Sequence, residues 1–144
     1  MSKPSTVHVI MACHNRAALT QRLLRQLDQV SCPLSITLYD DGSTDGTVES
    51  ALSSFPEITV LRGDGSAFWA RSMAIAEAHV LNSSTAGDDD VLLWMNDDVL
   101  LAEDAIERAM MIHALQPGAI IVGAMQDPID GSLTYSGLVQ QGRH

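Results

Sequence analysis

The 144 residues suffice for one domain with a hydrophobic core, and their 46% apolar content excludes an intrinsically disordered chain. The net charge of −10 disfavours binding to nucleic acid or to anionic membranes through phosphate groups. We recognise no signal peptide and no apolar run of membrane-spanning length. The two cysteines, Cys13 and Cys32, are too few for a disulfide framework. A cytoplasmic globular protein is the expectation.

Apolar residues follow strand and helix patterns in turn along the chain, separated by turn-forming residues. Strands are expected over residues 7–11, 36–39, 58–61, 91–95, 119–123 and 133–135. Helices are expected over residues 19–30, 48–55, 68–81 and 105–113. Four alternations of strand and helix predict an α/β fold, a three-layer sandwich in which a mostly parallel sheet has helices on both faces. We expect residues 1–144 to form a single domain.

Several details of this chain carry further structural expectations. The five apolar residues 91–95 predict a strand that is buried on both faces. Asn15 is expected to cap the helix that follows the first strand. Large side chains at four positions on the expected strands and helices are assigned to core packing rather than to ligand contacts. These are Trp69, Trp94, Met110 and Met111.

Polar clusters stand at the ends of three predicted strands. The clusters are Asp40-Asp41, Arg62-Gly63-Asp64 and Asn96-Asp97-Asp98. In a parallel sheet all three lie at one edge, where a single ligand could contact them. Neighbouring carboxylates repel each other, and a hard cation such as Mg²⁺ or Mn²⁺ would offset that repulsion. The alternative for the last cluster is a solvated loop ahead of the next helix.

Other candidate residues have a structural reading beside the functional one. Asp40 could accept a hydrogen bond from a base or a ribose hydroxyl, or it could bond within its own turn. Arg71 could reach a phosphate, or form a surface ion pair. His14 is either a ligand contact or a structural loop residue. Gly63 and Gly65 would allow a close backbone approach, although two glycines are a weak signal.

The order of four motifs carries a resemblance to a known family. The motifs are Ala12-Cys13-His14-Asn15-Arg16, then Asp40-Asp41-Gly42-Ser43-Thr44-Asp45-Gly46-Thr47, then Gly63-Asp64-Gly65 with Phe68-Trp69-Ala70, and finally Trp94-Met95-Asn96-Asp97-Asp98. The chain resembles the N-terminal, nucleotide-sugar-binding half of a family 2 glycosyltransferase with the Rossmann-like GT-A fold, and within that family it resembles rhamnosyltransferases. The resemblance covers nearly the whole chain.

The resemblance implies roles for particular residues. Those implied to contact or flank the nucleotide are Ala12, Cys13, His14, Asn15, Asp40, Gly63, Asp64, Arg71 and Asp97, of which Asp40 would contact a pyrimidine base or the ribose. Asp98 would bind Mg²⁺ or Mn²⁺, with Asp97 close to the ribose or the metal. Asn96 replaces the first carboxylate of the family's Asp-x-Asp motif and offers the metal an oxygen without a charge.

The implied function is an inverting transfer of a sugar from a uridine or thymidine diphosphate to an acceptor, such as a saccharide. The family's acceptor-binding half, with its catalytic base, is not recognised here, so we expect this chain alone to bind the donor but to transfer it poorly. The alternative is a non-catalytic nucleotide-sugar-binding or assembly module. A nucleotidyltransferase or dehydrogenase is disfavoured because no glycine-rich loop follows the first strand. Apolar surface around residues 120–135 predicts a homodimer.

Overall fold

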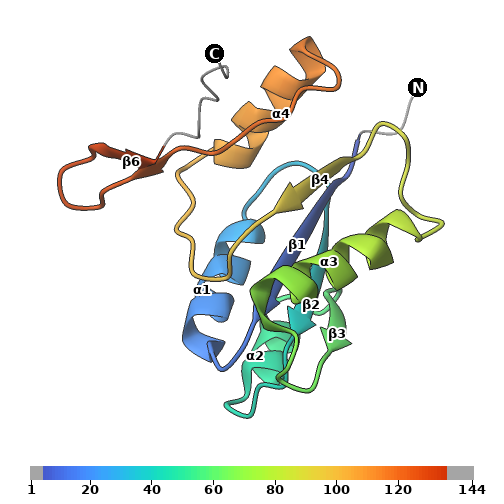
Figure 1. The fold of residues 1–144 in the computed structure, drawn as a ribbon. Helices are drawn as coiled ribbons and strands as arrows, with labels where there is room; N and C mark the ends of the chain where they lie inside the picture. Colours follow the sequence, from blue (N-terminus) through green and yellow to red (C-terminus); the bar gives the residue numbers. More distant parts are fainter. Residues whose placement is uncertain (1–4, 136–144) are drawn as a thin grey trace, which may run out of the picture. The chain divides into compact units, whose positions relative to one another are not determined.

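The computed structural model describes residues 5–135, and the chain divides into two compact units, residues 1–107 and 108–144. From β1 to α4 strands and helices alternate as expected, and two short strands follow (Figure 1). They are β1 (Val7–Cys13), α1 (Ala17–Leu27), β2 (Leu34–Asp40), α2 (Thr47–Ser54), β3 (Thr59–Arg62), α3 (Phe68–Leu81), β4 (Val91–Trp94), α4 (Ala105–Leu115), β5 (Met125–Gln126) and β6 (Leu133–Tyr135).

The first unit is built on a four-stranded parallel sheet with the strand order β3-β2-β1-β4. The crossovers from β1 to β3 run in one direction and place α1 and α2 together, whereas α3 returns across β1 and β2 on the opposite face (Figure 1). This arrangement confirms the predicted three-layer α/β fold. All four strands end at the same edge of the sheet, so the loops that follow them lie close together.

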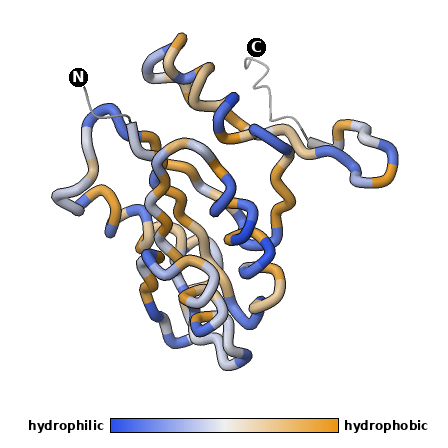
Figure 2. The backbone as a smooth tube through the Cα atoms, turned by 180° about the vertical axis from the view of Figure 1, so that it is seen from behind, coloured by the Kyte–Doolittle hydropathy of each residue, from blue (hydrophilic) through white to orange (hydrophobic). Residues whose placement is uncertain are grey.

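The core of this unit lies on both sides of β1, whose seven residues are all buried. Ile10 packs with Met73 and Ala76 of α3, which anchors that helix to the sheet. Hydrophobic and hydrophilic stretches alternate along the backbone, and several of the loops are hydrophilic (Figure 2). The helix that carries one wall of the site is therefore held by apolar packing.

β4 differs from the prediction of a strand buried on both faces. It is an edge strand of the four-stranded sheet, and its residues are only partly buried. Trp94 at its end is 46% exposed, and Trp69 on α3 is 52% exposed, so the assignment of both tryptophans to the core was wrong. How deeply an apolar strand is buried depends on its place in the sheet. β1 has a strand on each side, whereas β4 has a strand on one side only.

The predicted strand over residues 119–123 does not form. These residues are irregular, and the strand of this region is the shorter β5, which pairs antiparallel with β6 in a separate hairpin. Within residues 5–135 no strand lies beside 119–123, and an apolar run without a partner strand gains no ladder hydrogen bonds.

The two methionines of α4 that were assigned to the core are not both buried. Met111 is 67% exposed, and Met110 is half-buried. Self-association through residues 120–135 stays a prediction.

The group that caps the beginning of α1 also differs from the prediction, which was the Asn15 side chain. Asn15 precedes the helix with a positive φ of 52°, and the helix begins at Ala17 without a side-chain bond from the capping residue Arg16. The Asp45 carboxylate accepts the hydrogen bond of the Ala17 amide instead, at 3.0 Å. The loop after β2 therefore caps the helix after β1, which sequence spacing does not reveal.

Asp90 ties the beginning of β4 to the beginning of β1. Its carboxylate accepts hydrogen bonds from the amides of Thr6 and Gly87, at 2.7 and 2.8 Å, and lies 3.0 Å from His8. The two amides, with a smaller contribution from His8, lower the pKa of Asp90 from 3.8 to about 2. A carboxyl group whose pKa is lowered by folding stabilises the folded state above its unfolded-state pKa.

We therefore expect Asp90→Asn to reduce the free energy of unfolding by about 2 kcal/mol at neutral pH, the equivalent of the pKa shift. The difference from the wild type should shrink as the pH falls from about 4 through about 2, because the wild-type carboxylate is half protonated in the folded state at about pH 2 and is protonated in both states only at lower pH. Urea denaturation across this range measures it. Asp88→Asn, an exposed change in the same loop, should show no such difference, and a pH-independent loss in Asp90→Asn would refute the interpretation.

None of the helices within residues 5–135 is long and apolar enough to cross a membrane.

Burial raises the pKa of the thiols of Cys13 and Cys32. The rise is stronger for Cys13, where the Asp40 carboxylate adds to the effect of burial. Both cysteines are unpaired. The buried Cys13 thiol therefore has little thiolate character at neutral pH, so its role in the site is packing rather than nucleophilic chemistry.

Candidate functional site

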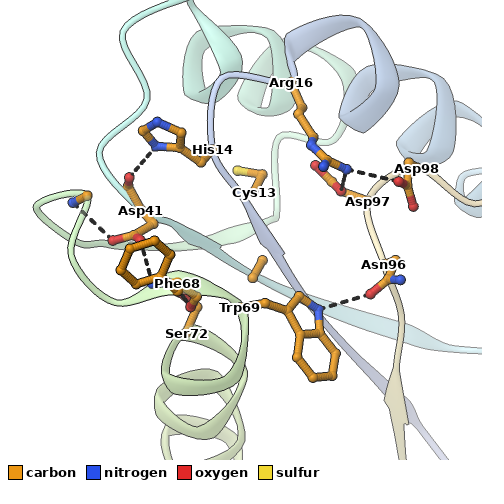
Figure 3. Close-up of a pocket in the computed structure, with 12 residues that line it drawn as sticks. Cys13, His14, Arg16, Asp41, Phe68, Trp69, Ser72, Asn96, Asp97 and Asp98 are labelled. Atoms are coloured by element: carbon orange, nitrogen blue, oxygen red, sulfur yellow. Dashed lines mark hydrogen bonds and ion pairs between the residues drawn. The ribbon is translucent and has the colours of Figure 1, made fainter.

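A pocket of ≈ 430 Å³ opens at the carboxyl edge of the sheet, within the size range of small-molecule sites (Figure 3). Its walls come from the ends of β1, β2 and β4 and from the beginning of α3. The lining residues are Ala12, Cys13, His14, Arg16, Asp41, Gly65, Phe68, Trp69, Ser72, Asn96, Asp97 and Asp98. Segments that are distant in the sequence meet here because the parallel strands all end at this edge.

Asp41 holds the loop between β3 and α3 in place. Its buried carboxylate accepts hydrogen bonds from the backbone amides of Gly65, Ala67 and Phe68, at 2.9 to 3.3 Å. These amides precede or begin α3, where backbone N–H groups have no partner within the helix. Phe68 takes a positive φ of 55° in this loop, so its ring is directed to the pocket rather than to the core.

His14 and Asn15 join the loop after β1 to the loop after β2. The His14 Nδ1 atom lies 2.6 Å from the Asp41 carbonyl oxygen, so Nδ1 carries the proton and donates it. Asn15 donates its backbone amide to the Ser43 hydroxyl at 2.9 Å and accepts the Thr44 amide at 2.8 Å. These contacts fix the backbone of residues 12–15 as one wall of the pocket.

The opposite wall carries two carboxylates that share one arginine. The Arg16 guanidinium donates to Asp97 at 3.2 Å and to Asp98 at 2.9 Å (Figure 3). Asp97 is buried and also accepts the Thr20 hydroxyl at 3.4 Å, and its burial raises its pKa, although Arg16 opposes that effect. The Asp98 side chain is 47% exposed. The two neighbours therefore differ: Asp97 is built into the wall, and Asp98 faces the solvent-accessible pocket.

Asn96 is engaged with an aromatic side chain. The Trp69 indole N–H donates to the Asn96 side-chain oxygen at 2.9 Å, and Trp69 stands edge-on to Trp94 with the ring centroids 6.0 Å apart. Both indoles are about half exposed, and Trp69 lines the pocket. The amide oxygen that the sequence offered to a metal therefore holds Trp69 with one of its two lone pairs, and the other lone pair stays available to a cation.

The structure brings together some of the residues predicted for the site and not others. Those that line the pocket are Ala12, Cys13, His14, Asn96, Asp97 and Asp98. Those that do not line it are Asn15, Asp40, Gly63, Asp64 and Arg71. Arg71 is exposed on α3. Hydrogen bonds from Ser66 lower the pKa of Asp64, and the positive charge of Arg71 lowers it slightly further.

Asp40 and Gly63 lie beneath the pocket. Asp40 is 1% exposed, and its carboxylate accepts the Ser43 amide at 3.3 Å and the Cys13 thiol at 3.6 Å. Gly63 leaves no room for a side chain, because a Cβ atom there would lie 2.6 Å from the Tyr39 hydroxyl, and its close approach to a ligand stays a prediction. A Cβ atom at Gly65 would make only an ordinary contact, 3.7 Å from the Asp41 carbonyl oxygen, but Gly65 takes a φ of 89°, which favours glycine.

Sequence reasoning missed Arg16, Asp41, Phe68, Trp69 and Ser72 as pocket residues. Two signals were present: Asp41 adjoins Asp40 in a strand-end cluster, and residues 68–70 belonged to a motif. Side chains alternate along a strand, so one of two adjacent aspartates points to the pocket and the other below it. Only the structure shows that Asp41 is the one in the pocket wall.

A divalent cation fits this site only in part. Among residues 5–135 no group of three or more His, Cys, Asp or Glu side chains is arranged to hold a metal ion. Asp98 offers an accessible carboxylate, and Asp97 stands beside it. Mg²⁺ is commonly held by one or two carboxylates together with the phosphates of a substrate, so the oxygen donors here suit a cation shared with a bound diphosphate.

Comparison with known proteins bears on which family this pocket belongs to. The sequence signature of the family described as "Glycosyl transferase family 2" matches residues 8–140. The chain belongs to glycosyl transferase family 2. The signature spans every segment that lines the pocket, and it confirms the resemblance at the level of the family. A comparison with curated proteins gives no significant match.

Two solved structures share the fold of this family 2 chain. One is a mannosyltransferase from Pyrobaculum calidifontis in complex with GDP-Man and Mn²⁺, with a TM-score of 0.65 and 21% identity over 89% of this chain. The chain spans 39% of that mannosyltransferase. The other is a 4-diphosphocytidyl-2C-methyl-D-erythritol synthase, with a TM-score of 0.65 and 14% identity, and the match covers 92% of this chain and 67% of that protein. At these identities the likeness concerns the fold.

Proposed function

We propose that this chain is the donor-binding part of a family 2 glycosyltransferase and binds a nucleotide-diphosphate sugar together with Mg²⁺ or Mn²⁺. The observation that carries the proposal is the meeting of Asp97 and Asp98 with the His14–Asp41 wall across one pocket at the carboxyl edge of the sheet. Ligands of open α/β sheets bind at this edge. The fold shared with a mannosyltransferase that was solved with GDP-Man and Mn²⁺ supports it.

The chemistry of the walls suggests how the donor lies. The nucleoside would lie against the loop of residues 12–15, whose backbone is fixed by contacts with the loop after β2. The diphosphate would lie towards Arg16 and Asp98, where the guanidinium and a cation bound to Asp98 can neutralise it. When bound, the cation stabilises the negative charge that the departing diphosphate acquires.

For the base we propose uridine or thymidine, as the resemblance at Asp40 implies. The buried Asp40 carboxylate already accepts the Ser43 amide, so we propose that it acts by ordering the turn under the base. A rhamnosyl donor is the first sugar to test, and a saccharide the first acceptor. We place the protein in the cytoplasm, which agrees with its unpaired cysteines.

The reaction class that we propose is inverting transfer, in which the acceptor hydroxyl displaces the diphosphate directly. This needs a base within hydrogen-bond reach of that hydroxyl, and orientation of the acceptor. Asp127 and Asp130 lie in the turn that joins β5 to β6 and accept backbone amides there, so we assign neither to that role. The second candidate function is nucleotide-sugar binding without transfer.

Calorimetric titration tests whether the chain binds a nucleotide at all, which both candidate functions require. Uridine, thymidine, guanosine and adenosine diphosphates are titrated with and without Mn²⁺, and uridine- and thymidine-linked sugars are then incubated with an acceptor pool while nucleotide release is followed. Metal-dependent binding supports the proposal, and acceptor-dependent release favours the enzyme over the binding module. Failure to bind any of the four nucleotides would refute both candidates.

Asp98→Asn tests the metal site directly. The change removes one charged oxygen ligand while the side chain keeps its size, so we expect Mn²⁺-dependent binding of uridine diphosphate to weaken by about 1–3 kcal/mol. Asp88→Asn, which removes the same charge at the opposite edge of the sheet, is the control and should leave the affinity unchanged. Equal calorimetric affinities for the wild type and Asp98→Asn would exclude Asp98 as a ligand.

A further inference from the structure

Arg16 occupies the position in which a cation would meet the carboxylates of the site. A single guanidinium nitrogen, Nη1, lies 3.2 Å from an oxygen of Asp97 and 2.9 Å from an oxygen of Asp98. The guanidinium therefore neutralises both carboxylates from one point between them. A metal ion bound to the same Asp98 oxygen would bring a second cation next to this nitrogen, which like-charge repulsion disfavours.

The two carboxylates are held to Arg16 with different firmness. Asp97 is 3% exposed and has a second partner in the Thr20 hydroxyl. Asp98 is about half exposed, as is Arg16, and exposed ion pairs contribute little to stability. The contact between Arg16 and Asp98 is therefore the one that a competing cation can displace, while the contact with Asp97 keeps the arginine nearby.

From this geometry we infer that Arg16 is a displaceable internal counter-ion that competes with a divalent cation for Asp98. The inference rests on the proposed function, because it concerns the cation of that same site. It explains what offsets the repulsion between the Asp97 and Asp98 carboxylates when no metal is bound. It also gives the neutral side chain of Asn96 a consequence for the affinity of the site for a cation. With an amide at position 96 and an arginine on the carboxylate pair, the site attracts a free cation weakly and depends on the diphosphate to complete its ligands.

Arg16→Gln tests the competition, with Arg22→Gln as the matched control. Arg22 is exposed on α1, the helix that Arg16 precedes, and donates to the backbone oxygen of Asp98 at 3.1 Å, so its change removes an equal charge near the site but frees no carboxylate. Arg16→Lys keeps the charge at the original position. The readout is Mn²⁺ binding itself, followed by the loss of the electron paramagnetic resonance signal of free Mn²⁺, with and without uridine diphosphate.

We expect Arg16→Gln to bind Mn²⁺ alone about tenfold more tightly than the wild type, while Arg22→Gln and Arg16→Lys stay within about twofold of it. Equal gains in Arg16→Gln and Arg22→Gln would overturn the inference, because general electrostatics would then explain both. Unchanged or weaker Mn²⁺ binding by Arg16→Gln would overturn it as well. If the wild type binds uridine diphosphate with Mn²⁺ in that case, the proposed function stands without the inference, whereas absence of nucleotide binding removes the function too.

Discussion

Replacing Asp41 by alanine is expected to reduce the free energy of unfolding by about 3 kcal/mol and to abolish nucleotide binding. The Asp41 carboxylate accepts the amides of Gly65, Ala67 and Phe68, and it is buried. Without it, these donors lose a charged acceptor in a place that water reaches poorly. The loop that directs Phe68 and Trp69 to the pocket would lose its shape, although α3 would stay packed through Met73.

Chemical denaturation and calorimetry with uridine diphosphate measure the two effects. Asp64→Ala is the matched control, because Asp64 lies in the same loop but is exposed and accepts hydrogen bonds from the amide and hydroxyl of Ser66. Its loss of stability should stay below about 0.5 kcal/mol, the usual limit for surface changes. Asp41→Asn should fall between the two, since an amide presents one oxygen acceptor instead of two. Equal stability of Asp41→Ala and Asp64→Ala would contradict the assigned role.

Gly42→Ala is the second change with a large expected effect. Gly42 has a φ of 74°, and an added Cβ would lie 2.8 Å from the Gly65 nitrogen and 3.0 Å from the Asp64 carbonyl carbon. Both are backbone atoms, which cannot rotate away as a side chain would. We expect a loss of about 3 kcal/mol, made up of about 1 kcal/mol for the left-handed backbone and the rest for the displaced loop.

Gly46→Ala isolates the first of these contributions. Gly46 has a similar φ of 83°, but nothing lies within 4 Å of its Cβ position. Denaturation of the two variants side by side should therefore show a loss of only about 1 kcal/mol for Gly46→Ala. Gly42→Ala should in addition weaken nucleotide binding, because it pushes the loop after β3 away from the loop after β2. Equal losses would mean that the loops do not touch as closely as described.

The alternation of strands and helices, and with it the fold, was predictable because it is local. Apolar residues at period two or near 3.6 select strand or helix within about ten residues, and the parallel order follows from the crossover helices. The strand at 119–123 was predicted wrongly for the complementary reason. Its apolar residues satisfy the local pattern, but a strand also needs a neighbour, and the described residues supply none.

The sequence by itself determined that polar groups gather at one sheet edge, that Asp97 and Asp98 stand there, and that the chain resembles family 2 glycosyltransferases. Only the tertiary structure decided what each group touches. In the structure Asp41 rather than Asp40 lines the pocket, the Asn96 side-chain oxygen accepts a hydrogen bond from Trp69, and Arg16 forms ion pairs with both Asp97 and Asp98. The physical reason is distance along the chain: these contacts join segments 24 to 82 residues apart, and their geometry depends on the packing of α1 and α3 against the sheet.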